Sequence, residues 1–441
     1  MYSYAKSLPV AGTFDVIVAG SGSAGSPAAI ACARHGARTL LIERMPFLGG
    51  TSTAVLDTFY GFYTPGAEPR RVVGGIASEV TERLSALGVC LERPNTHGVA
   101  GTAVTYHPEY LKVVWESMTR ESGCSVLLNG WIQDVVREEG TIRAVVVATK
   151  SGLQLYQADY FIDATGDADL CYLGGIAYEQ AGELAPAQTL TTTFKMVNVD
   201  EEKRKALPKA ELNRLMGEAA ESGRFRLPRK EGSDHVTPVA HMRATIMTRI
   251  KSFERREGRT VNATDPELLS RAEMEGRLQA LQYIGFLKAY VPGYQDAELS
   301  SFGVQIGVRE TRRIYGLYRL NAGDVLAARQ FEDQIGLCGA PIEDHHEGED
   351  TLWRSLPQGQ CVGIPYRTLI PMDTSNLLVA GRCFSADHVA HSSVRSMAQC
   401  MAMGEAAGAA AALALRDSKS TSDVDSAELR LLLSQNGAIL S

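Results

Sequence analysis

The sequence predicts an α/β fold with two lobes, one built on a parallel sheet and one of α+β structure. Three observations predict it. An apolar run of strand length near the N-terminus leads directly into a glycine-rich turn and an Ala-rich helix. Two later apolar runs, near residues 161 and 378, also end on glycine, as strands of the same sheet would. The long segment between these two runs is charged and amphipathic, as expected of a separate lobe.

Length and charge exclude some classes of protein. The chain has 441 residues, a formal net charge of −7 and 45% hydrophobic residues. This composition is too apolar for a disordered chain and too acidic for a generic binder of phosphate backbones, so we expect no nucleic-acid partner. At roughly 150 residues per domain, two to three lobes are expected, enough to enclose a sizeable ligand.

The sequence lacks the signals of a membrane or secreted protein. The longest apolar candidate, Ala406 to Leu415, is about half of the roughly 18 to 20 residues that span a bilayer. The segment from Met1 to Thr13 holds one Lys and no apolar core of a signal peptide. We therefore expect no membrane partner and a cytoplasmic location.

Cysteine and histidine spacing indicates no metal site. The eight cysteines are scattered, and no two of them form a Cys-x-x-Cys pair. Neither a dithiol redox centre nor a zinc ribbon is therefore expected. Asp344-His345-His346 lies in an acidic stretch, Glu343 to Asp350, and is interpreted as a solvated loop. No metal ion is predicted.

The N-terminal glycine turn has the features of a Rossmann-type dinucleotide site. Phe14 to Ala19 reads FDVIVA, and the G-x-G-x-x-G turn GSGSAG and the Ala-rich segment Pro27 to Arg34 follow it. The three glycines permit the tight turn, the approach of backbone amides to a pyrophosphate, and the close packing of helix on strand. Glu43 ends the next strand, 18 residues past Gly25, where a carboxylate accepts both ribose hydroxyls and repels a 2′-phosphate. The expected contacts are Gly20, Gly22, Ser23, Ala24, Gly25 and Glu43.

Three later segments are expected to follow an extended dinucleotide. A second glycine turn comes soon after Glu43, a strand at 158–163 runs into Ala-Thr-Gly-Asp, and a strand at 376–380 closes on glycine before a long helix of small residues, roughly 396–415. Small side chains let that helix approach a cofactor closely, and its N-terminal amides favour an anionic group. The alternatives are a glycine turn without a ligand, a surface loop, and a helix that only packs on the sheet. The expected contacts are Arg44, Gly50, Thr51, Ser52, Ala164, Thr165, Gly166, Asp167, Gly381, Arg382, Ser396, Met397 and Ala398.

A set of motifs extends along nearly the whole chain. They are GSGSAG at 20–25, YHPE at 106–109, FIDATGDADL at 161–170, VRETRRI at 308–314, PIEDH at 341–345, IPYR at 364–367, NLLVAGRC at 376–383, and SSVR with the GEAAGAAA helix. With this set, the chain resembles the FAD-dependent oxidoreductase family of the glutathione-reductase-like flavoprotein superfamily. The resemblance implies FAD as cofactor and a Rossmann-type FAD-binding domain with a second, substrate-binding α+β domain. It implies no particular substrate.

Absent motifs bear on the electron donor. No second strand, G-x-G-x-x-G turn and helix follows residue 60, so we expect an organic substrate, rather than NAD(P)H, to reduce the flavin. The predicted reaction is hydride transfer from a small polar organic substrate to flavin N5, as in a dehydrogenase or an oxidase. No His lies between Met45 and Thr96, where related enzymes attach FAD, so non-covalent FAD is expected. The alternatives are a flavin monooxygenase using NAD(P)H and oxygen, and a non-catalytic or electron-transfer flavoprotein subunit. The sequence leaves a homo-oligomer or an electron-accepting partner open.

Two polar clusters are candidates for catalysis. His388, His391 and Arg395 lie between the last predicted strand and the last long helix, where the resemblance directs the chain toward the flavin. A His there can take a proton as hydride leaves carbon, whereas the alternative is a histidine bonded to backbone carbonyls. Arg395 is expected to neutralise a substrate carboxylate or the reduced flavin, or to pair with Asp387.

The second cluster follows a strand-like run, 301–308, and precedes another, 314–320. Strand alternation would place Arg309, Thr311 and Arg313 on one face and Glu310 and Arg312 on the other. Arg309 is the catalytic candidate from this cluster, through binding of an anion, and an ion-pair network is the alternative.

The predicted FAD-binding domain is discontinuous, comprising residues 1–65, 100–182 and 355–416. Residues 183–354 are expected to form the substrate-binding cap domain, with amphipathic helices at 201–217 and 266–290. A helix is also expected to begin near Asn321. Residues 417–441 are expected to form a linker and a short C-terminal helix.

Overall fold

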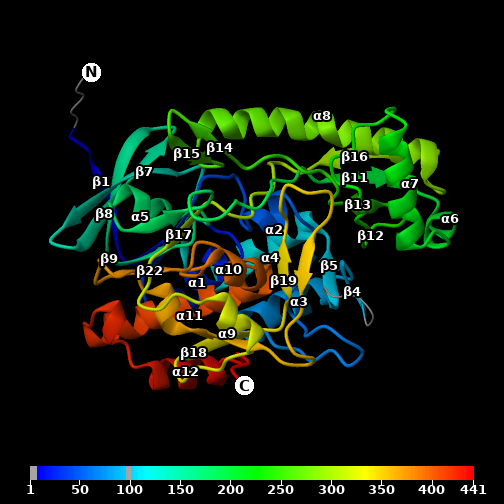
Figure 1. The fold of residues 1–441 in the computed structure, drawn as a ribbon. Coiled ribbons are helices and arrows are strands. Elements are labelled where there is room, and N and C mark those ends of the chain that lie inside the picture. Colours follow the sequence, from blue (N-terminus) through cyan, green and yellow to red (C-terminus); the bar gives the residue numbers. More distant parts are fainter. Residues whose placement is uncertain (1–6, 96–100) are drawn as a thin grey trace.

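The fold is known from a computed structural model, which describes residues 7–95 and 101–441. A seven-stranded sheet forms its centre, in the order β6-β2-β1-β9-β8-β7, with β22 paired to β9 as well (Figure 1). The pairs β6–β2, β2–β1, β1–β9 and β9–β22 are parallel, whereas β9–β8 and β8–β7 are antiparallel. The strands are β1 (Val10–Ala19), β2 (Thr39–Glu43), β6 (Ser125–Leu128), β7 (Trp131–Glu138), β8 (Thr141–Thr149), β9 (Gly152–Asp163) and β22 (Leu377–Val379).

This sheet confirms the predicted parallel α/β core. The strands expected from 158–163 and 376–380 both belong to it, and β22 lies beside β9 although more than 200 residues separate them in sequence. The first predicted domain segment begins at residue 1 and the second at residue 100, so both of these boundaries fall outside the described residues.

Alternating side chains give the sheet two buried faces. Val16 and Val18 of β1 contribute to one core, whereas Ile17 and Ala19 contribute to a second core on the opposite face. The first core also contains four helices, α1 (Gly25–Arg34), α3 (Ile76–Ala86), α4 (Pro108–Glu121) and α11 (Met397–Asp417). The sheet is therefore covered on both sides, as a parallel sheet requires.

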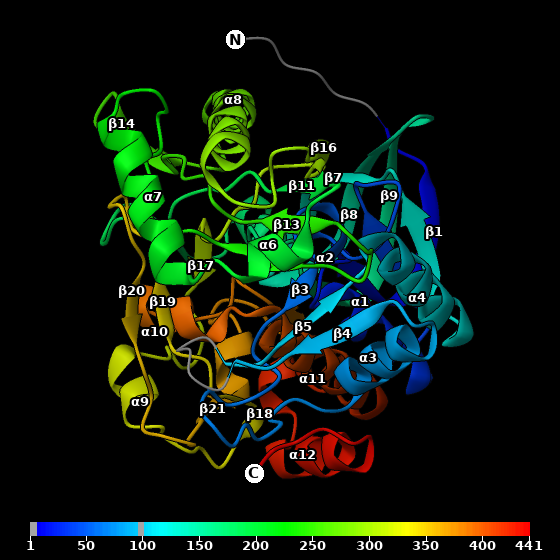
Figure 2. The same ribbon diagram turned by 90° about the vertical axis from the view of Figure 1, so that its right-hand side faces the viewer.

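A second, smaller sheet lies apart from the first and carries the long helix α8 (Pro266–Tyr290) across it (Figure 2). Its antiparallel order is β12-β13-β11-β16. The two predicted amphipathic segments are helical here, the first split into α6 (Glu201–Lys205) and α7 (Lys209–Glu221). Leu212, Met216, Tyr283 and Phe286 join the helices to the sheet in one core. The strands are β11 (Phe194–Val197), β12 (Asp234–Val236), β13 (Arg243–Thr245) and β16 (Glu298–Phe302).

The two sheets, each with its helices, form two layers, and the remaining elements are short. The expected strand-like runs around residues 301–320 are wrong for most of their length, because the chain there is largely irregular and only β16 and β17 are extended. The helix near Asn321 is confirmed, with a capping box between Asn321 and Asp324. These elements are α2 (Thr51–Ala54), β3 (Thr58–Phe59), β4 (Cys90–Arg93), β5 (Ala103–Tyr106), α5 (Asp169–Leu173), β10 (Tyr178–Gln180), β14 (Phe253–Arg256), β15 (Arg259–Asn262), β17 (Arg312–Ile314), α9 (Ala322–Leu326), β18 (Gln334–Cys338), β19 (Ile342–Asp344), β20 (Leu352–Arg354), β21 (Val362–Pro365), α10 (His388–Val394) and α12 (Ser426–Gln435).

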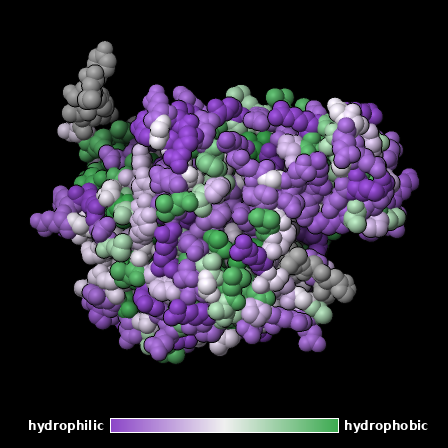
Figure 3. Space-filling model, in the orientation of Figure 1, coloured by the Kyte–Doolittle hydropathy of each residue, from purple (hydrophilic) through white to green (hydrophobic). Residues whose placement is uncertain are grey.

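Helix α11 is the one helix in the described ranges that is long and apolar enough to cross a bilayer. In this fold, however, 89% of its apolar window is buried, against α1 and the sheet. The outer face in Figure 3 is mostly hydrophilic, with hydrophobic residues in small separate patches, as on an ordinary protein surface.

Candidate functional site: a cavity between the two layers

One cavity of about 560 Å³ joins the glycine turn of the large sheet to residues of the second layer. Most of the predicted cofactor contacts line it, although they come from four separate segments of the chain. Gly25, Ser52 and Ala398 do not line it. Those that do are Gly20, Gly22, Ser23, Ala24, Glu43, Arg44, Gly50, Thr51, Ala164, Thr165, Gly166, Asp167, Gly381, Arg382, Ser396 and Met397.

The glycine turn is built for close approach of backbone. Gly20 has a φ of 84°, in the left-handed region that favours glycine. A Cβ on Gly25 would lie 1.7 Å from the carbonyl oxygen of Gly20, so helix α1 can begin there only with glycine. A Cβ on Gly22, by contrast, would meet no atom within 4 Å. The turn therefore leaves open space at the position expected for a pyrophosphate.

The start of α1 suits an anion. In the described structure, its first turn has no acidic residue and no side-chain cap. The hydroxyl of Ser23 is buried beside the cavity and has no hydrogen-bond partner among the described residues. A phosphate oxygen would accept from this hydroxyl and from the free amides of the helix N-terminus. These residues fit the diphosphate of a dinucleotide.

Glu43 lies at the cavity wall and also braces the turn. Its Oε2 accepts from the backbone N of Ser21 at 2.8 Å and from its Oγ at 2.6 Å. Its Oε1 accepts from the backbone N of Met45 at 2.8 Å. The carboxylate thus has lone pairs in use before any ligand binds, and a ribose hydroxyl would share these oxygens.

Helix α11 holds the N-terminal half of α1 in place. A Cβ on Gly404 would lie 2.0 Å from the carbonyl oxygen of Ala24, and one on Gly408 would lie 2.3 Å from that of Ala28. The two helix backbones are therefore in direct contact, as the run of small residues predicted. The N-terminal end of α11 reaches the cavity through Ser396 and Met397.

Asp167 and Arg382 form an ion pair at the cavity wall. Arg382 Nη2 lies 2.6 Å from Asp167 Oδ1, which also accepts from Thr311 Oγ1 at 2.7 Å. Arg382 lowers the pKa of Asp167 against the opposing effect of burial. Burial and the charge of Asp167 raise the pKa of the neighbouring Asp169 to about 7. At this wall the positive charge of Arg382 therefore compensates the negative charge of Asp167.

Two arginines from separate segments add charge to the same cavity: Arg309 follows β16 of the second sheet, and Arg395 lies between α10 and α11. Arg309 Nη1 donates to the carbonyl oxygen of Thr189 and to Thr191 Oγ1, both at 2.7 Å. Arg395 Nη2 donates to Gln188 Oε1 at 2.8 Å. Both guanidiniums line the cavity, so the structure brings together these two predicted residues, which lie 86 positions apart.

Glu343 and His345 lie beside these arginines and were not predicted. His345 Nε2 lies 2.9 Å from Glu343 Oε1. Burial, then the charge of Arg309, lowers the pKa of His345 to about 3. Burial would raise the pKa of Glu343, but His345, Arg395 and Arg309 lower it to about 2. The pair is therefore an ionised carboxylate that accepts from a neutral imidazole.

The expected solvated loop at 344–346 is wrong for His345. Only 6% of this residue is exposed, because β19 and β20 pair as a hairpin and direct its side chain inward. The acidic residues around His345 suggested a solvent-exposed loop and gave no indication of its burial. The PIEDH motif at 341–345, part of the family resemblance, was the one indication in the sequence that His345 belongs to the site. Other cavity-lining residues that were not predicted are Tyr60, Arg93, Lys209, Arg229 and Glu231.

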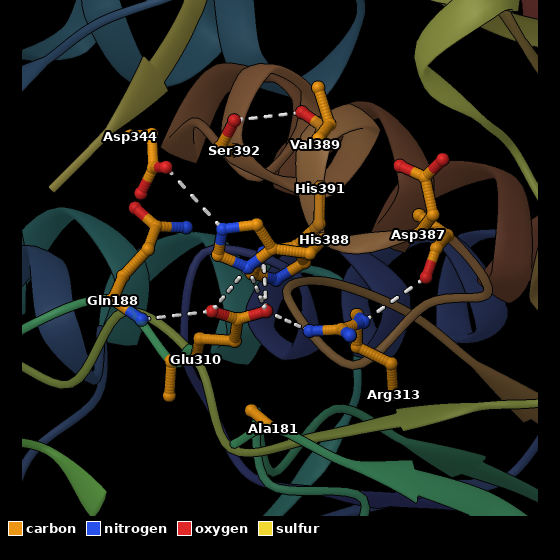
Figure 4. A network of polar contacts seen from close by, with 12 residues as sticks. Ala181, Gln188, Glu310, Arg313, Asp344, Asp387, His388, Val389, His391 and Ser392 are labelled. Carbon is orange, nitrogen blue, oxygen red and sulfur yellow. Dashed lines mark hydrogen bonds and ion pairs between the residues drawn. The ribbon is translucent and has the colours of Figure 1, made fainter. Parts of the chain in front are cut away.

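His388 and His391 are not among the residues that line the cavity. Figure 4 shows both imidazoles next to the carboxylate of Glu310. His388 Nδ1 is 3.0 Å from Glu310 Oε1, and its Nε2 is 3.5 Å from Asp344 Oδ2. His391 is fully buried, and its Nε2 lies 2.8 Å from the carbonyl oxygen of Arg382. Burial lowers the pKa of His391 well below its ordinary range. A direct catalytic role for either histidine stays a prediction that their location does not favour.

Glu310 is the centre of this network. The segment is irregular, so the predicted alternation of faces is wrong: Glu310 and Arg313 pair with each other instead of pointing apart. Oε2 of Glu310 accepts from the backbone N of Gln188 at 3.0 Å. The side chain of Gln188 in turn holds Arg395, so the network reaches the cavity through two residues. Asp387 is occupied as the N-cap of α10 and does not pair with Arg395 in the described structure.

The chain is similar to a protein of known function over part of its length. It is 32% identical over 184 residues to the tRNA uridine 5-carboxymethylaminomethyl modification enzyme MnmG of Alkaliphilus metalliredigens. That match covers 38% of this chain and spans about a quarter of the relative's length, 27%. Two solved structures are similar at a TM-score of 0.49. The first is a geranylgeranyl bacteriochlorophyll reductase-like protein from Thermoplasma acidophilum (12% identity, 96% of this chain and 84% of that one). The other is p-nitrophenol 4-monooxygenase from Pseudomonas putida (10% identity, 96% and 86%).

A family comparison matches residues 15–433, nearly the whole chain. The matched range includes the glycine turn, both later strands of the sheet, Arg309, Arg395 and helix α11. The matched family is described as FAD dependent oxidoreductase, in agreement with the open space at Gly22 and with the buried hydroxyl of Ser23, which has no partner among the described residues. The chain belongs to the FAD-dependent oxidoreductase family, and its cofactor is FAD.

Proposed function

We propose that this enzyme oxidises a small polar organic substrate, which gives up a hydride to N5 of FAD. The observation that carries the proposal is the composition of the cavity. The same space is lined by the glycine turn that fits FAD and by Arg309, Arg395, Glu343 and His345. Bound FAD supplies the two-electron acceptor, and these four side chains are available to a substrate beside it.

The side chains have complementary roles in this proposal. Arg309 and Arg395 bind and orient the substrate, because both line the cavity and each retains N–H donors that no hydrogen bond among the described residues uses. Glu343 accepts the proton that the substrate loses, through the carboxylate oxygen that His345 does not occupy. Because its pKa is lowered to about 2, Glu343 is ionised but weakly basic, and it takes the proton as the hydride leaves and the hydroxyl becomes strongly acidic. His345 holds this carboxylate in position at 2.9 Å. About 35% of the Glu343 side chain is exposed, into the cavity that it lines.

The path of the chain supports a particular subtype of this fold. We propose the glutathione-reductase-like subtype, with the predicted discontinuous FAD-binding domain and a cap domain at 183–354. Support comes from β22, which returns to the large sheet, and from α11, which returns to the cavity. The cytoplasmic location and any partner chain stay predictions.

The first experiment is the visible spectrum of the purified protein, with chromatography of the chromophore released by heat. Released FAD leads to anaerobic mixing with hydroxy acids, amines and sugars, and loss of the oxidised flavin band identifies hydride donors. If only NAD(P)H with oxygen consumed the substrate, a monooxygenase would replace this proposal. Bleaching by no small molecule, with a second chain co-purifying, would indicate an electron-transfer subunit.

The proton acceptor has its own test. Glu343→Gln should slow flavin reduction by the substrate by about 10² to 10⁴-fold while FAD content stays unchanged. Glu347→Gln is the matched control, because Glu347 lies in the same connection but is exposed to solvent. An unchanged rate in Glu343→Gln would exclude Glu343 as the base.

A further inference from the structure

Arg309 and Arg395 lack the ion pairs that three other cations of the cavity form. Within the described ranges, neither has a carboxylate oxygen within 4.0 Å, and each is held by uncharged acceptors. Arg229 pairs with Glu231 at 3.0 Å, Lys209 pairs with Glu231 at 3.1 Å, and Arg382 pairs with Asp167 at 2.6 Å. Arg44 and Arg93 also line the cavity without an ion pair among the described residues, and they donate to Gln305 and Thr105. Of these four guanidiniums, those of Arg309 and Arg395 lower the pKa of Glu343.

Both guanidiniums have donors left over. The hydrogen bonds of Arg309 use only Nη1, and those of Arg395 use only Nη2. Nε of Arg395 is buried and lacks a partner among the described residues. Burial, then the charge of Arg395, lowers the pKa of Arg309. The two guanidiniums donate to the adjacent residues Thr189 and Gln188 and line the same cavity, so one anion there would accept from both.

Glu343 sets the second requirement on the ligand. Its backbone oxygen lies 3.5 Å from Arg395 Nη2, so its segment passes directly beside the arginine pair. Two arginines and one ionised glutamate leave the group one positive charge in excess. A ligand with net negative charge balances this charge, whereas a zwitterionic amino acid or a neutral alcohol does not.

We propose that Arg309 and Arg395 bind the carboxylate of a 2-hydroxy acid, whose hydroxyl-bearing carbon then lies beside Glu343. This inference rests on the proposed function and names its substrate class. In the reaction, the C–H bond at C2 breaks and its hydride, with both electrons, reduces FAD. The hydroxyl proton passes to Glu343, and the C–O bond becomes the carbonyl of a 2-oxo acid. FAD is the oxidant and takes up both electrons.

Anion binding is measured without turnover, by calorimetric titration of the FAD-loaded enzyme with oxalate. We expect Arg309→Gln and Arg395→Gln each to weaken oxalate binding by about 10- to 100-fold, the effect of losing charge-assisted hydrogen bonds. Arg249→Gln is the matched control. Arg249 is 6% exposed, has no carboxylate within 4.0 Å among the described residues and does not line the cavity. We expect it to change oxalate binding by less than about threefold.

Three outcomes would overturn the anion site. They are no binding of oxalate to the FAD-loaded enzyme, equal weakening in Arg249→Gln, and unchanged binding in both Arg309→Gln and Arg395→Gln. FAD content is determined for every variant, so that loss of cofactor is not mistaken for loss of the anion. If the arginine variants lose FAD but bind oxalate normally after reconstitution, the two arginines serve the cofactor instead.

The substrate class is tested with matched compounds. Lactate, alanine and propane-1,2-diol share a three-carbon skeleton, and glycolate and malate extend the first class. We expect bleaching of the flavin by at least one hydroxy acid and by neither the amino acid nor the diol. Bleaching by the diol or by alanine, at a rate equal to that of lactate, would retain the proposed function and exclude this substrate class. Oxalate binding without bleaching by any compound would retain the anion site and exclude the proposed function.

Discussion

The imidazole of His388 is hydrogen-bonded to the buried carboxylate of Glu310, with 3.0 Å between Nδ1 and Oε1. Glu310 is 1% exposed and also accepts from the backbone of Gln188 and pairs with Arg313. Gln188 in turn holds Arg395, which lines the cavity. Hydrogen bonds therefore connect His388 and Glu310 to Arg395 through Gln188.

Removal of the charge at Glu310 should destabilise the fold. Glu310→Gln leaves the buried Arg313 with only Glu179 and takes an acceptor from His388. We expect the free energy of unfolding, measured by urea denaturation, to fall by about 3 to 5 kcal/mol, as when one partner is removed from a buried pair. Glu202→Gln is the control, because Glu202 is 90% exposed and pairs only with Lys205, and should change stability by less than about 1 kcal/mol. A change below about 1 kcal/mol in Glu310→Gln would contradict the role of the network.

The contact between α11 and α1 should tolerate no methyl group. Gly404→Ala would place its Cβ 2.0 Å from the carbonyl oxygen of Ala24, so the helices must separate next to the glycine turn. We expect a loss of about 1 to 3 kcal/mol in stability and weaker retention of FAD. Gly217→Ala is the matched control, because Gly217 lies inside α7 and its Cβ would meet nothing within 4 Å. This control should be stabilising by about 0.5 to 1 kcal/mol, and equal effects of the two substitutions would disprove the contact.

Loss of the Glu43 carboxylate should weaken FAD binding. Glu43→Ala removes the acceptor for Ser21 and Met45 as well as that for a ribose. We expect a dissociation constant for FAD that is higher by about 10- to 100-fold, measured by fluorescence titration of the apoprotein. Glu138→Ala, at a side chain 67% exposed on β7, is the control. Retention of FAD at wild-type affinity in Glu43→Ala would show that the ribose lies elsewhere.

Stability should depend on pH through Glu405. Burial raises the pKa of this carboxyl, which lies on α11 against the start of α3, from 4.5 to about 7. The folded chain then binds more protons than the unfolded chain between these pH values, so the Glu405 contribution to stability falls as pH rises from about 4.5 to about 7. The loss is on the order of 3 kcal/mol.

Comparison with Glu405→Gln isolates this contribution. Asp169 and His345 also titrate with shifted pKa values, but they are present in both proteins and cancel in the difference. The variant should match the wild type near pH 4.5 and exceed its stability near pH 8. A difference in unfolding free energy that does not vary with pH would mean that Glu405 has an ordinary pKa.

The nucleotide-binding part of the fold was predictable because its requirements are local. The turn at 20–25 needs glycine where φ is positive or where a Cβ would strike backbone, and neighbouring residues meet this need by themselves. The predicted strands correspond to the buried end of β9 and to the short apolar strand β22, and the small residues of α11 indicate close helix packing. The family resemblance then added FAD, which the family comparison bears out.

The charged residues on the other side of the cavity could not be predicted in the same way. His345 and His388 both lie in polar sequence, yet one lines the cavity and the other does not and binds Glu310. Arg309 and Arg313 belong to one short arginine cluster, but only Arg309 lacks an acidic partner in the described structure.

The sequence by itself therefore determined the α/β core and the glycine turn, because glycine geometry and strand and helix periodicity depend on adjacent residues. The cofactor followed from the resemblance of its motifs to a family, which the family comparison bears out. Only the tertiary structure decided which charged side chains share the cavity. Burial and ion pairing depend on neighbours from distant segments, such as Glu343 beside Arg309 and Arg395. Sequence patterns do not predict which distant residues come into contact.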